Sequence, residues 1–324
     1  MRAAMLTEAG VKIQSTPEPA PKTNEVKVRV RACGLNRADL LVASGHAHGR
    51  IGGAGTIIGL EFAGDVVEVG ADAKGVAVGD RVMCSGGSGW AEYAVADWGR
   101  VTRIPDANVS YEQAATLPVA LQTMHDAIVT NGQLQAGQAV LIQGASSGVG
   151  LMAMKIAKVL GAGLVIGTST DAGRRAKLTD FGADLAVDSR DAGWVDQVLQ
   201  ATDGAGVDLI VDQLSGYVAN DNMRATRLMG RIVNVGRLGG FKGEFDFDLH
   251  ALRRIQYIGV TFRTRTVEQV REIVRKTYAD LGAHVASGAL ALPIDSVFEL
   301  NRAADALAHM KANVHFGKIV LRVD

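Results

Sequence analysis

A β-rich domain interrupted by an α/β domain with a parallel sheet is the fold that the sequence predicts. The 324 residues are enough for two domains at roughly 150 residues each. Short β runs fill the first hundred residues, and strands alternate with helices after Pro118. The C-terminal tail returns to a strand, helix, strand order. We therefore expect residues 1–118 and 268–324 to form the first domain and residues 119–267 the second.

The strands of the first domain are predicted from alternation and turns. Residues 26–31 alternate valine with lysine or arginine, which is typical of a strand with one buried face and one face in water. Glycine-rich segments such as 86–89 separate the β runs. We expect further strands at 65–69, 81–84, 91–95 and 101–104, and hence a small barrel or sandwich.

The second domain is predicted from apolar strands that alternate with helices. Strands that are apolar along most of their length indicate a parallel sheet covered on both faces. We expect strands at 139–143, 164–168, 185–187, 207–211, 232–235 and 256–262, and helices at 148–160, 172–181, 194–201, 217–228 and 267–281. The tail should add a strand at 289–292, a helix at 301–310 and a strand at 318–323.

The composition excludes several classes of protein. The 34 lysine and arginine residues balance 34 aspartate and glutamate residues, so we expect no nucleic-acid partner, which would require a basic surface. Cys33 and Cys84 are too few for a disulfide framework or a cysteine-rich zinc site. The N-terminal residues do not resemble a signal peptide, and glutamines and glycines interrupt the longest uncharged run, 127–154. We expect a cytoplasmic protein with no membrane partner.

A turn of small residues, Gly144 to Gly150, joins the expected strand 139–143 to the next helix. Such a turn lets backbone N–H groups approach a pyrophosphate, and the helix N-terminus adds unpaired donors and partial positive charge. A final glycine allows the helix and strand to pack closely. The turn therefore favours a dinucleotide site, although it is not a strict G-x-G-x-x-G.

The same turn also fits two other interpretations. Its Gly-x-Ser-x-Gly pattern, centred on Ser146, matches the nucleophile elbow of serine hydrolases. A hydrolase would also require Asp212 with His250 or His315, and its elbow does not need the third glycine. A glycine-rich turn without a ligand is the other alternative, and it is uncommon at the carboxyl end of a parallel strand.

The end of the second strand bears on the choice between NADH and NADPH. An NAD site usually has Asp or Glu here for the ribose 2′-OH. This chain has Ser169 and Thr170, followed by Arg174 and Arg175, and a guanidinium with hydroxyls suits a 2′-phosphate. Asp171 would favour NADH instead, unless its carboxylate caps the following helix. We expect NADPH.

Six segments in a specific order and spacing carry a family resemblance. They are 34–40 (GLNRADL), 59–64 (GLEFAG), 78–82 (VGDRV), 117–120 (LPVA), 144–150 (GASSGVG) and 315–320 (HFGKIV). Together they resemble the medium-chain dehydrogenase/reductase superfamily, in its zinc-independent quinone oxidoreductase-like branch. The resemblance implies an α/β fold in which a Rossmann parallel-sheet domain is inserted into a GroES-like β-rich catalytic domain.

The resemblance also predicts that no metal is bound. Where zinc-dependent relatives have their metal ligands, this sequence has Asn36, Leu60 and Val119. Leucine and valine cannot ligate zinc, which would leave Glu61 alone. Without a Lewis acid to activate an alcohol, the remaining chemistry is hydride delivery to an acceptor that conjugation has already activated.

The resemblance thus implies an NADPH-dependent reductase of quinones or of the conjugated C=C of α,β-unsaturated carbonyl compounds. The small-molecule electrophile would lie beside Asn36, whose amide would donate a hydrogen bond to the developing oxyanion. Tyrosines that some relatives have in the pocket and near the adenine are replaced by Leu41 and Ser189, so no proton donor is evident. An NADPH-binding redox sensor or structural protein without turnover is the alternative.

The cofactor-binding residues are predicted from the glycine turn, the strand ends and the resemblance. The resemblance also implies a homodimer formed through the edge strand 256–262, and His46 and His48 are interpreted as loop or substrate contacts. The expected cofactor-binding residues are Thr123, Gly144, Ser146, Ser147, Gly148, Val149, Gly150, Ser169, Thr170, Arg174, Leu214, Val235, Gly236, Arg237, Phe262, Thr264 and Asn313.

Overall fold

The chain folds into two compact units. The computed structural model describes residues 1–47, 49, 51–105 and 108–324. The first unit comprises Met1–Val119 and Phe262–Asp324, and the second comprises Ala120–Thr261. The limits expected from the sequence, 118/119 and 267/268, lie close to these.

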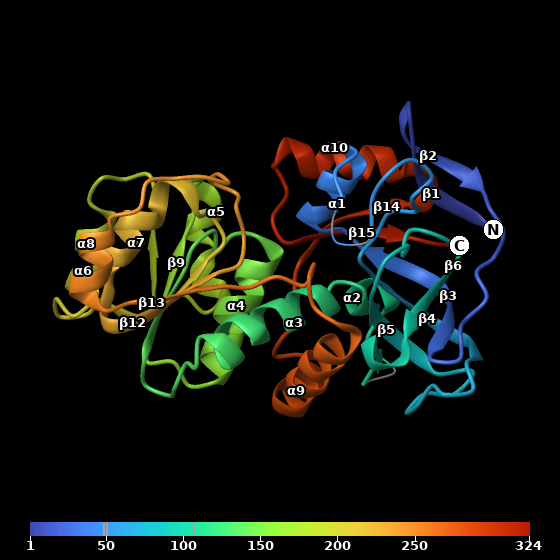
Figure 1. The fold of residues 1–324 in the computed structure, drawn as a ribbon, viewed down its shortest axis with the longest axis horizontal. Coiled ribbons are helices and arrows are strands. Elements are labelled where there is room, and N and C mark those ends of the chain that lie inside the picture. Colours follow the sequence, from blue (N-terminus) through green and yellow to red (C-terminus); the bar gives the residue numbers. More distant parts are fainter. Residues whose placement is uncertain (48, 50, 106–107) are drawn as a thin grey trace. The chain divides into compact units, whose positions relative to one another are not determined.

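The first unit is built on a mostly antiparallel sheet that the C-terminal tail completes, with β14 and β15 paired parallel at one edge (Figure 1). In the described part of the chain its strand order is β14-β15-β3-β4-β5-β7, with β6 paired to β3, while β1 and β2 form a separate hairpin. Strand β15 joins the sheet by pairing antiparallel to β3, so the two ends of the chain share one sheet. The strands are β1 (Arg2–Thr7), β2 (Gly10–Ser15), β3 (Glu25–Gly34), β4 (Glu61–Val69), β5 (Arg81–Ser85), β6 (Tyr93–Asp97), β7 (Val101–Arg103), β14 (Ile294–Glu299) and β15 (Lys318–Arg322).

The valines that alternate in the sequence form the centre of this core. Val26, Val28 and Val30 in β3 are buried together with Phe62 and Trp90, because successive side chains of a strand point to opposite faces. Four helices belong wholly to this unit among its described residues: α1 (Arg37–Ala43), α2 (Tyr111–Ala114), α9 (Val267–Ala286) and α10 (Ala303–Ala312).

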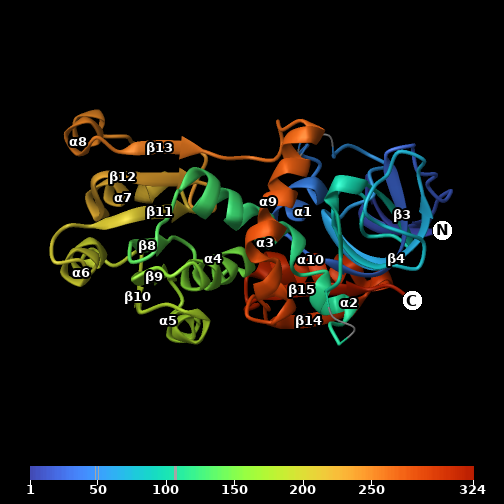
Figure 2. The same cartoon turned by 90° about the horizontal axis from the view of Figure 1, so that it is seen from below.

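The second unit contains a parallel sheet. Figure 2 shows its strands side by side in the order β10-β9-β8-β11-β12-β13, with β13 at one edge. Every pairing that joins neighbours in this order is parallel, so the carboxyl ends of the strands meet along one edge of the sheet. The strands are β8 (Ala139–Ile142), β9 (Leu164–Thr168), β10 (Leu185–Val187), β11 (Val207–Asp212), β12 (Thr226–Asn234) and β13 (Gln256–Gly259).

Helices connect these strands, as a parallel sheet requires. Buried apolar side chains from strands and helices form its core, among them Leu141, Ile166, Trp194, Ile210 and Ile232. The helices are α3 (Pro118–His125), which spans the boundary between the units, α4 (Gly148–Val159), α5 (Ala172–Ala176), α6 (Trp194–Ala201), α7 (Ala219–Ala225) and α8 (Phe247–Arg253), with a π-helical turn at Asp126–Asn131.

Several expected elements are wrong in part or entirely. The strand expected at 256–262 ends at Gly259, and the helix expected at 172–181 is α5 followed by a 3₁₀ turn at Leu178–Phe181. The expected strand 289–292 is turn and irregular structure, and β14 begins only at Ile294. Leu290 and Leu292 are buried without pairing in a sheet. Their apolar pattern therefore indicates burial and not a strand. The expected helix 217–228 ends at Ala225, because β12 already begins at Thr226.

None of the helices in the described residues combines the length and the apolar character that a membrane crossing needs.

Candidate functional site

The glycine turn lies between β8 and α4, at the carboxyl edge of the parallel sheet. Ser147 is the N-cap of α4, and its Oγ accepts a hydrogen bond from the N–H of Gly150 at 3.1 Å. Gly144 has a φ of 68°, a left-handed conformation that glycine adopts without strain. Its N–H donates to Thr168 Oγ1 at 2.9 Å, which ties the turn to the end of β9.

Close backbone packing explains the last glycine of this turn. A Cβ on Gly150 would lie 2.6 Å from Ala145 Cα and 2.6 Å from the carbonyl oxygen of Gly144. A similar approach occurs at Gly236, where a Cβ would lie 2.5 Å from the carbonyl oxygen of Gln213. Glycine is therefore needed at both places for strand ends and helix to approach one another.

The surroundings of Ser146 do not match a serine hydrolase. Ser146 is half-buried, and its Oγ accepts a hydrogen bond from Ser169 Oγ at 3.1 Å. His250 lies in α8, where its ring packs on Phe245 with 5.4 Å between the centroids. Asp212 uses its Oδ1 to accept hydrogen bonds from the backbone N–H groups of Leu214 and Ser215, both at 2.9 Å. These contacts support a turn that binds through its backbone.

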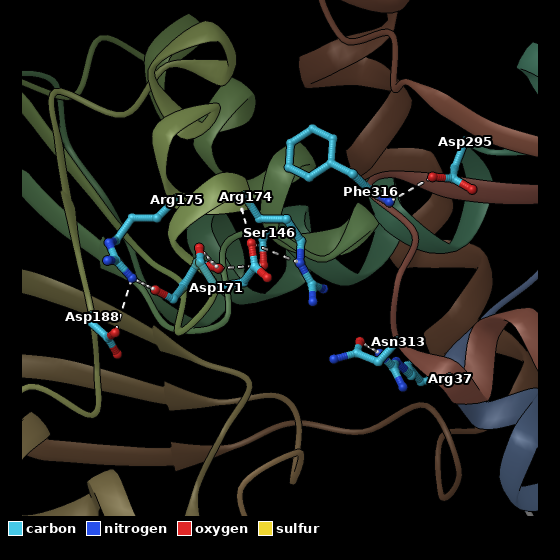
Figure 3. A network of polar contacts seen from close by, with 10 residues as sticks. Arg37, Ser146, Asp171, Arg174, Arg175, Asp188, Asp295, Asn313 and Phe316 are labelled. Carbon is cyan, nitrogen blue, oxygen red and sulfur yellow. Dashed lines mark hydrogen bonds and ion pairs between the residues drawn. The ribbon is translucent and has the colours of Figure 1, made fainter.

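The polar residues after β9 make different contacts. Asp171 is the N-cap of α5 and accepts the N–H of Arg174 at 2.8 Å, which confirms the expected capping role. That hydrogen bond also holds the pKa of Asp171 below its usual range. Arg175 donates to the carbonyl oxygen of Ser169 at 2.7 Å and to Asp188 at 3.1 Å (Figure 3). Arg174 lies beside Asp171 at 3.8 Å, so Arg175, and not Arg174, forms the closer ion pair in this region.

The ends of β11 and β12 are held together by a strained serine. Ser215 has a φ of 58°, which costs a non-glycine residue on the order of 1–3 kcal/mol. Its Oγ donates to the carbonyl oxygen of Gly236 at 2.7 Å and accepts from Asn234 Nδ2. The backbone around Leu214, the residue before Ser215, is therefore held in place. Arg237 donates a hydrogen bond to the carbonyl oxygen of Val235 at 3.1 Å.

Tyr217 lies beside the expected position Ser189, a contact that the sequence did not indicate. Its hydroxyl lies 3.1 Å from Ser189 Oγ, and the guanidinium of Arg190 lies over its ring at 3.7 Å from the centroid. Ser189 follows β10, whereas Tyr217 follows β11, and two other strands lie between these in the sheet order. A tyrosine thus lies beside the position where some relatives carry one, but it comes from a different part of the chain.

In the first unit, Asn36 lies against a buried ion pair. Its Nδ2 donates to Glu61 Oε1 at 2.8 Å, and its Oδ1 accepts from Lys318 Nζ at 3.0 Å. Lys318 and Glu61 form an ion pair at 2.6 Å, with side chains that are 5% and 0% exposed. Glu61 Oε2 accepts the backbone N–H of Val119 at 2.8 Å. Asn36 and Val119, two of the positions that the resemblance matches to zinc ligands, therefore bind Glu61 by hydrogen bonds.

Gly34 makes room for this group. A Cβ on Gly34 would lie 2.3 Å from the carbonyl oxygen of Ala115 and 2.5 Å from Glu61 Oε1. Among the residues described, no three or more His, Cys, Asp or Glu side chains gather so that they could hold a metal ion.

The remaining expected residues are spread over both units. Thr123 lies half-buried in α3 of the second unit. Asn313 ends α10 in the left-handed conformation and accepts a hydrogen bond from Arg37 (Figure 3). Phe262 and Thr264 lie in the irregular segment before α9, in the first unit.

The two histidines of the expected loop are described only in part. Ser44 Oγ lies 3.0 Å from His46 Nδ1, whereas His48 lies outside the described residues.

Asp39 is a second buried acid next to Asn36. Its Oδ2 accepts the backbone N–H of Asn36 at 2.7 Å, while its Oδ1 has no hydrogen-bond partner in the described part of the chain. Burial raises the pKa of Asp39 to about 7, and Glu61 adds to that rise while the Asn36 N–H and Lys318 oppose it. The carboxyl group therefore takes up its proton near neutral pH.

We expect this proton to make stability depend on pH. The folded chain keeps it up to about pH 7, whereas an unfolded aspartate loses it near pH 4. The free energy of unfolding should therefore fall as pH rises from about 4 to 7, with Asp39 contributing up to about 1.4 kcal/mol per pH unit. Urea unfolding at several pH values should show a smaller slope for Asp39→Asn, which should be the more stable protein at pH 8. Equal slopes in both proteins would contradict a buried, protonated Asp39.

Two family models match the chain. Residues 22–106 match the alcohol dehydrogenase GroES-like domain, and residues 148–277 match the zinc-binding dehydrogenase model. The synaptic vesicle membrane protein VAT-1 homolog of Rattus norvegicus is 30% identical over 342 residues, which cover 99% of this chain and 84% of that protein. A phenolphthiocerol/phthiocerol polyketide synthase of Mycobacterium tuberculosis is 32% identical over 303 residues, which cover 94% of this chain but only 14% of the synthase.

Solved structures resemble the whole chain. A mycobacterial quinone oxidoreductase superposes with a TM-score of 0.87 at 25% identity, covering 99% of both chains. The CurK enoyl reductase superposes with a TM-score of 0.87 at 26% identity, covering 100% of this chain and 99% of that one. The fold, the two family models and these similarities agree. The chain belongs to the medium-chain dehydrogenase/reductase superfamily, in its quinone oxidoreductase-like branch.

Proposed function

We propose that the chain is an NADPH-dependent reductase that acts on quinones or on the conjugated C=C of α,β-unsaturated carbonyl compounds, without a metal. The observation that carries the proposal is the group formed by Asn36, Glu61 and Lys318. It combines an amide donor with an ammonium ion where zinc-dependent relatives bind their metal. The names of two similar proteins, a quinone oxidoreductase and an enoyl reductase, support the same acceptor class.

The turn before α4 fits a dinucleotide. Ser147 satisfies the N–H of Gly150, and the N-terminal N–H groups of the twelve-residue helix α4 provide further donors for phosphate oxygens. Gly144 and the half-buried Ser146 have small side chains, which would let a dinucleotide approach the backbone of the turn closely. Bound NADPH would supply the hydride.

The side chains after β9 support NADPH over NADH. One oxygen of Asp171, Oδ1, caps α5, which favours a role in the helix over the ribose 2′-OH contact of an NAD site. Ser169, Thr170 and Arg174 would then bind the 2′-phosphate, because a guanidinium pairs well with phosphate oxygens.

The contacts of Glu61 support chemistry without a Lewis acid. Both of its carboxylate oxygens accept hydrogen bonds, from Lys318, Asn36 and the Val119 backbone. A divalent cation here would be repelled by the Lys318 ammonium and would find no ligand in Leu60 or Val119. The chain itself would then assist only acceptors that are already electrophilic, with Asn36 donating a hydrogen bond to the carbonyl oxygen as negative charge develops there.

The test is the oxidation of NADPH and NADH with a panel of acceptors. We expect turnover with a benzoquinone and with a simple enone, little with saturated ketones and aldehydes, and no loss of rate after chelation. Arg174→Ala should raise KM for NADPH about ten- to a hundredfold, which corresponds to the loss of one charge-assisted hydrogen bond, and should leave KM for NADH nearly unchanged. Tight NADPH binding without turnover on any acceptor would favour the redox sensor instead.

We also propose that the chain forms a homodimer and that it is located in the cytoplasm. Strand β13 pairs only with β12 in the described sheet, with Ile258 half-buried at that edge, so pairing of two copies through β13 would form a homodimer. A light-scattering mass near twice 34.0 kDa would agree with it. A cytoplasmic location is likewise proposed.

A further inference from the structure

Lys318 uses all of its hydrogen-bonding capacity inside the first unit. Its Nζ donates to the carbonyl oxygen of Leu35 at 2.8 Å, to Asn36 Oδ1 at 3.0 Å and to Glu61 Oε1 at 2.6 Å. An ammonium group has three donors, so each is directed at one acceptor. The side chain is 5% exposed, and its position is therefore fixed by the protein and not by water.

These contacts determine which way the Asn36 amide points. Lys318 can only donate a hydrogen bond, and the Glu61 carboxylate can only accept one. The amide oxygen faces the ammonium and the amide nitrogen faces the carboxylate. A flipped amide would place its nitrogen against a cation and its oxygen against an anion, which would be repulsive on both sides.

The fixed orientation leaves one hydrogen of Asn36 Nδ2 outside this group. One hydrogen is bonded to Glu61, and the other points away from it in the plane of the amide. Lys318 also polarises the amide through Oδ1, and hydrogen bonds that polarise one another strengthen the next donor in the chain. Asn36 is half-buried, so the residue is not fully enclosed by the core.

We propose that Lys318 and Glu61 are positioning residues that hold the Asn36 amide in one orientation, and that Lys318 also strengthens the second Nδ2–H as a hydrogen-bond donor. The inference rests on the proposed function for its catalytic consequence, but not for the locked amide. A stabilising role alone would not need these charges, because a buried ion pair can often be replaced by apolar residues without loss of stability.

The test compares Lys318→Met with the double variant Lys318→Met/Glu61→Gln. The single variant leaves the carboxylate buried and unpaired, so it should lower Tm as well as kcat. The double variant removes both charges and should recover Tm. We expect its kcat to remain on the order of tenfold below the original, with KM for the acceptor changed much less. Recovery of kcat together with Tm would overturn the proposal.

Arg271→Met is the matched control. Arg271 forms a partly buried ion pair with Asp97 at 2.7 Å in the same unit, and its guanidinium lies over the Trp98 ring, so neither contact involves Asn36, Glu61 or Lys318. This variant should lower Tm and leave kcat nearly unchanged. A fall in kcat equal to that of Lys318→Met would show that loss of stability alone explains the effect.

A second readout does not depend on activity. In ¹⁵N-labelled protein, the two Nδ2 hydrogens of Asn36, assigned by their loss in Asn36→Asp, should exchange with water at different rates, because one is bonded to Glu61. The difference should become smaller in the double variant, where a neutral amide replaces the carboxylate as the acceptor. If no acceptor is reduced, the proposed function fails, and unequal exchange would still support the locked amide; equal exchange in the unmodified protein would overturn the inference itself.

Discussion

Gly150→Ala should weaken NADPH binding more than about tenfold, the equivalent of at least 1.4 kcal/mol, and should lower the stability of the second unit. The added Cβ would lie 2.6 Å from Ala145 Cα and 2.6 Å from the Gly144 carbonyl oxygen. Both are backbone atoms of the turn, so they cannot move aside as a flexible side chain would. Overpacking of this kind typically costs about 1–3 kcal/mol, and relief by moving α4 would also displace the N–H groups proposed to bind phosphate.

Gly282→Ala provides the matched control. Gly282 also lies in a helix, α9, but a Cβ there would meet nothing within 4 Å. Alanine in a helix interior is favoured over glycine by roughly 0.5–1 kcal/mol, so this variant should be slightly more stable and should bind NADPH normally. Fluorescence titration with NADPH and thermal unfolding measure both effects. Unchanged affinity in Gly150→Ala would remove the turn from the proposed cofactor site.

The carboxyl edge of the parallel sheet could be predicted from the sequence because the signals are local. The apolar strands 164–168 and 185–187 and the turn of small residues are each defined by consecutive residues, and the structure has β9 and β10 at those bounds. The strand expected at 289–292 failed for the same reason: a local apolar pattern does not distinguish a paired strand from buried irregular chain. Pro293 lacks the N–H that a ladder needs, and its carbonyl oxygen accepts the N–H of Lys318 where β14 and β15 begin.

The contacts that define the candidate site could not be predicted from local sequence patterns. Glu61 and Lys318 are 257 positions apart, and their ion pair depends on β15 joining the sheet beside β3. Ser189 and Tyr217 are 28 positions apart and come from the ends of different strands. The residue types at 36, 60 and 119 could indicate the loss of metal ligands, but not that an ammonium ion lies beside Glu61. That arrangement follows only from the tertiary fold.

Asn36→Ala should lower kcat about ten- to a hundredfold, with a smaller change in KM. The amide is the side chain proposed to donate to the acceptor oxygen as it becomes negative, so its loss should affect the transition state more than the bound ground state. Removing one donor of an oxyanion hole costs on the order of 10²–10³ in turnover in a well-studied hydrolase, and a partly solvated oxygen should cost less. The variant also removes a partner from both Lys318 and Glu61, but it leaves their ion pair intact, so a moderate decrease in Tm is expected.

Asn36→Asp distinguishes the loss of the hydrogen-bond donor from the loss of packing at this position. It is close in size to asparagine and can still accept from Lys318, but it places a third carboxylate beside Glu61 and Asp39 and offers no N–H. Its kcat should therefore fall at least as far as that of Asn36→Ala at pH 8, and it should recover in part at lower pH, where a protonated carboxyl can donate a hydrogen bond. If Asn36 only anchors the start of α1, both variants should instead lose activity in proportion to Tm and show no such recovery. A stably folded Asn36→Ala with unchanged kcat would remove Asn36 from the mechanism, because the effect on the developing oxygen is the one property that packing cannot replace.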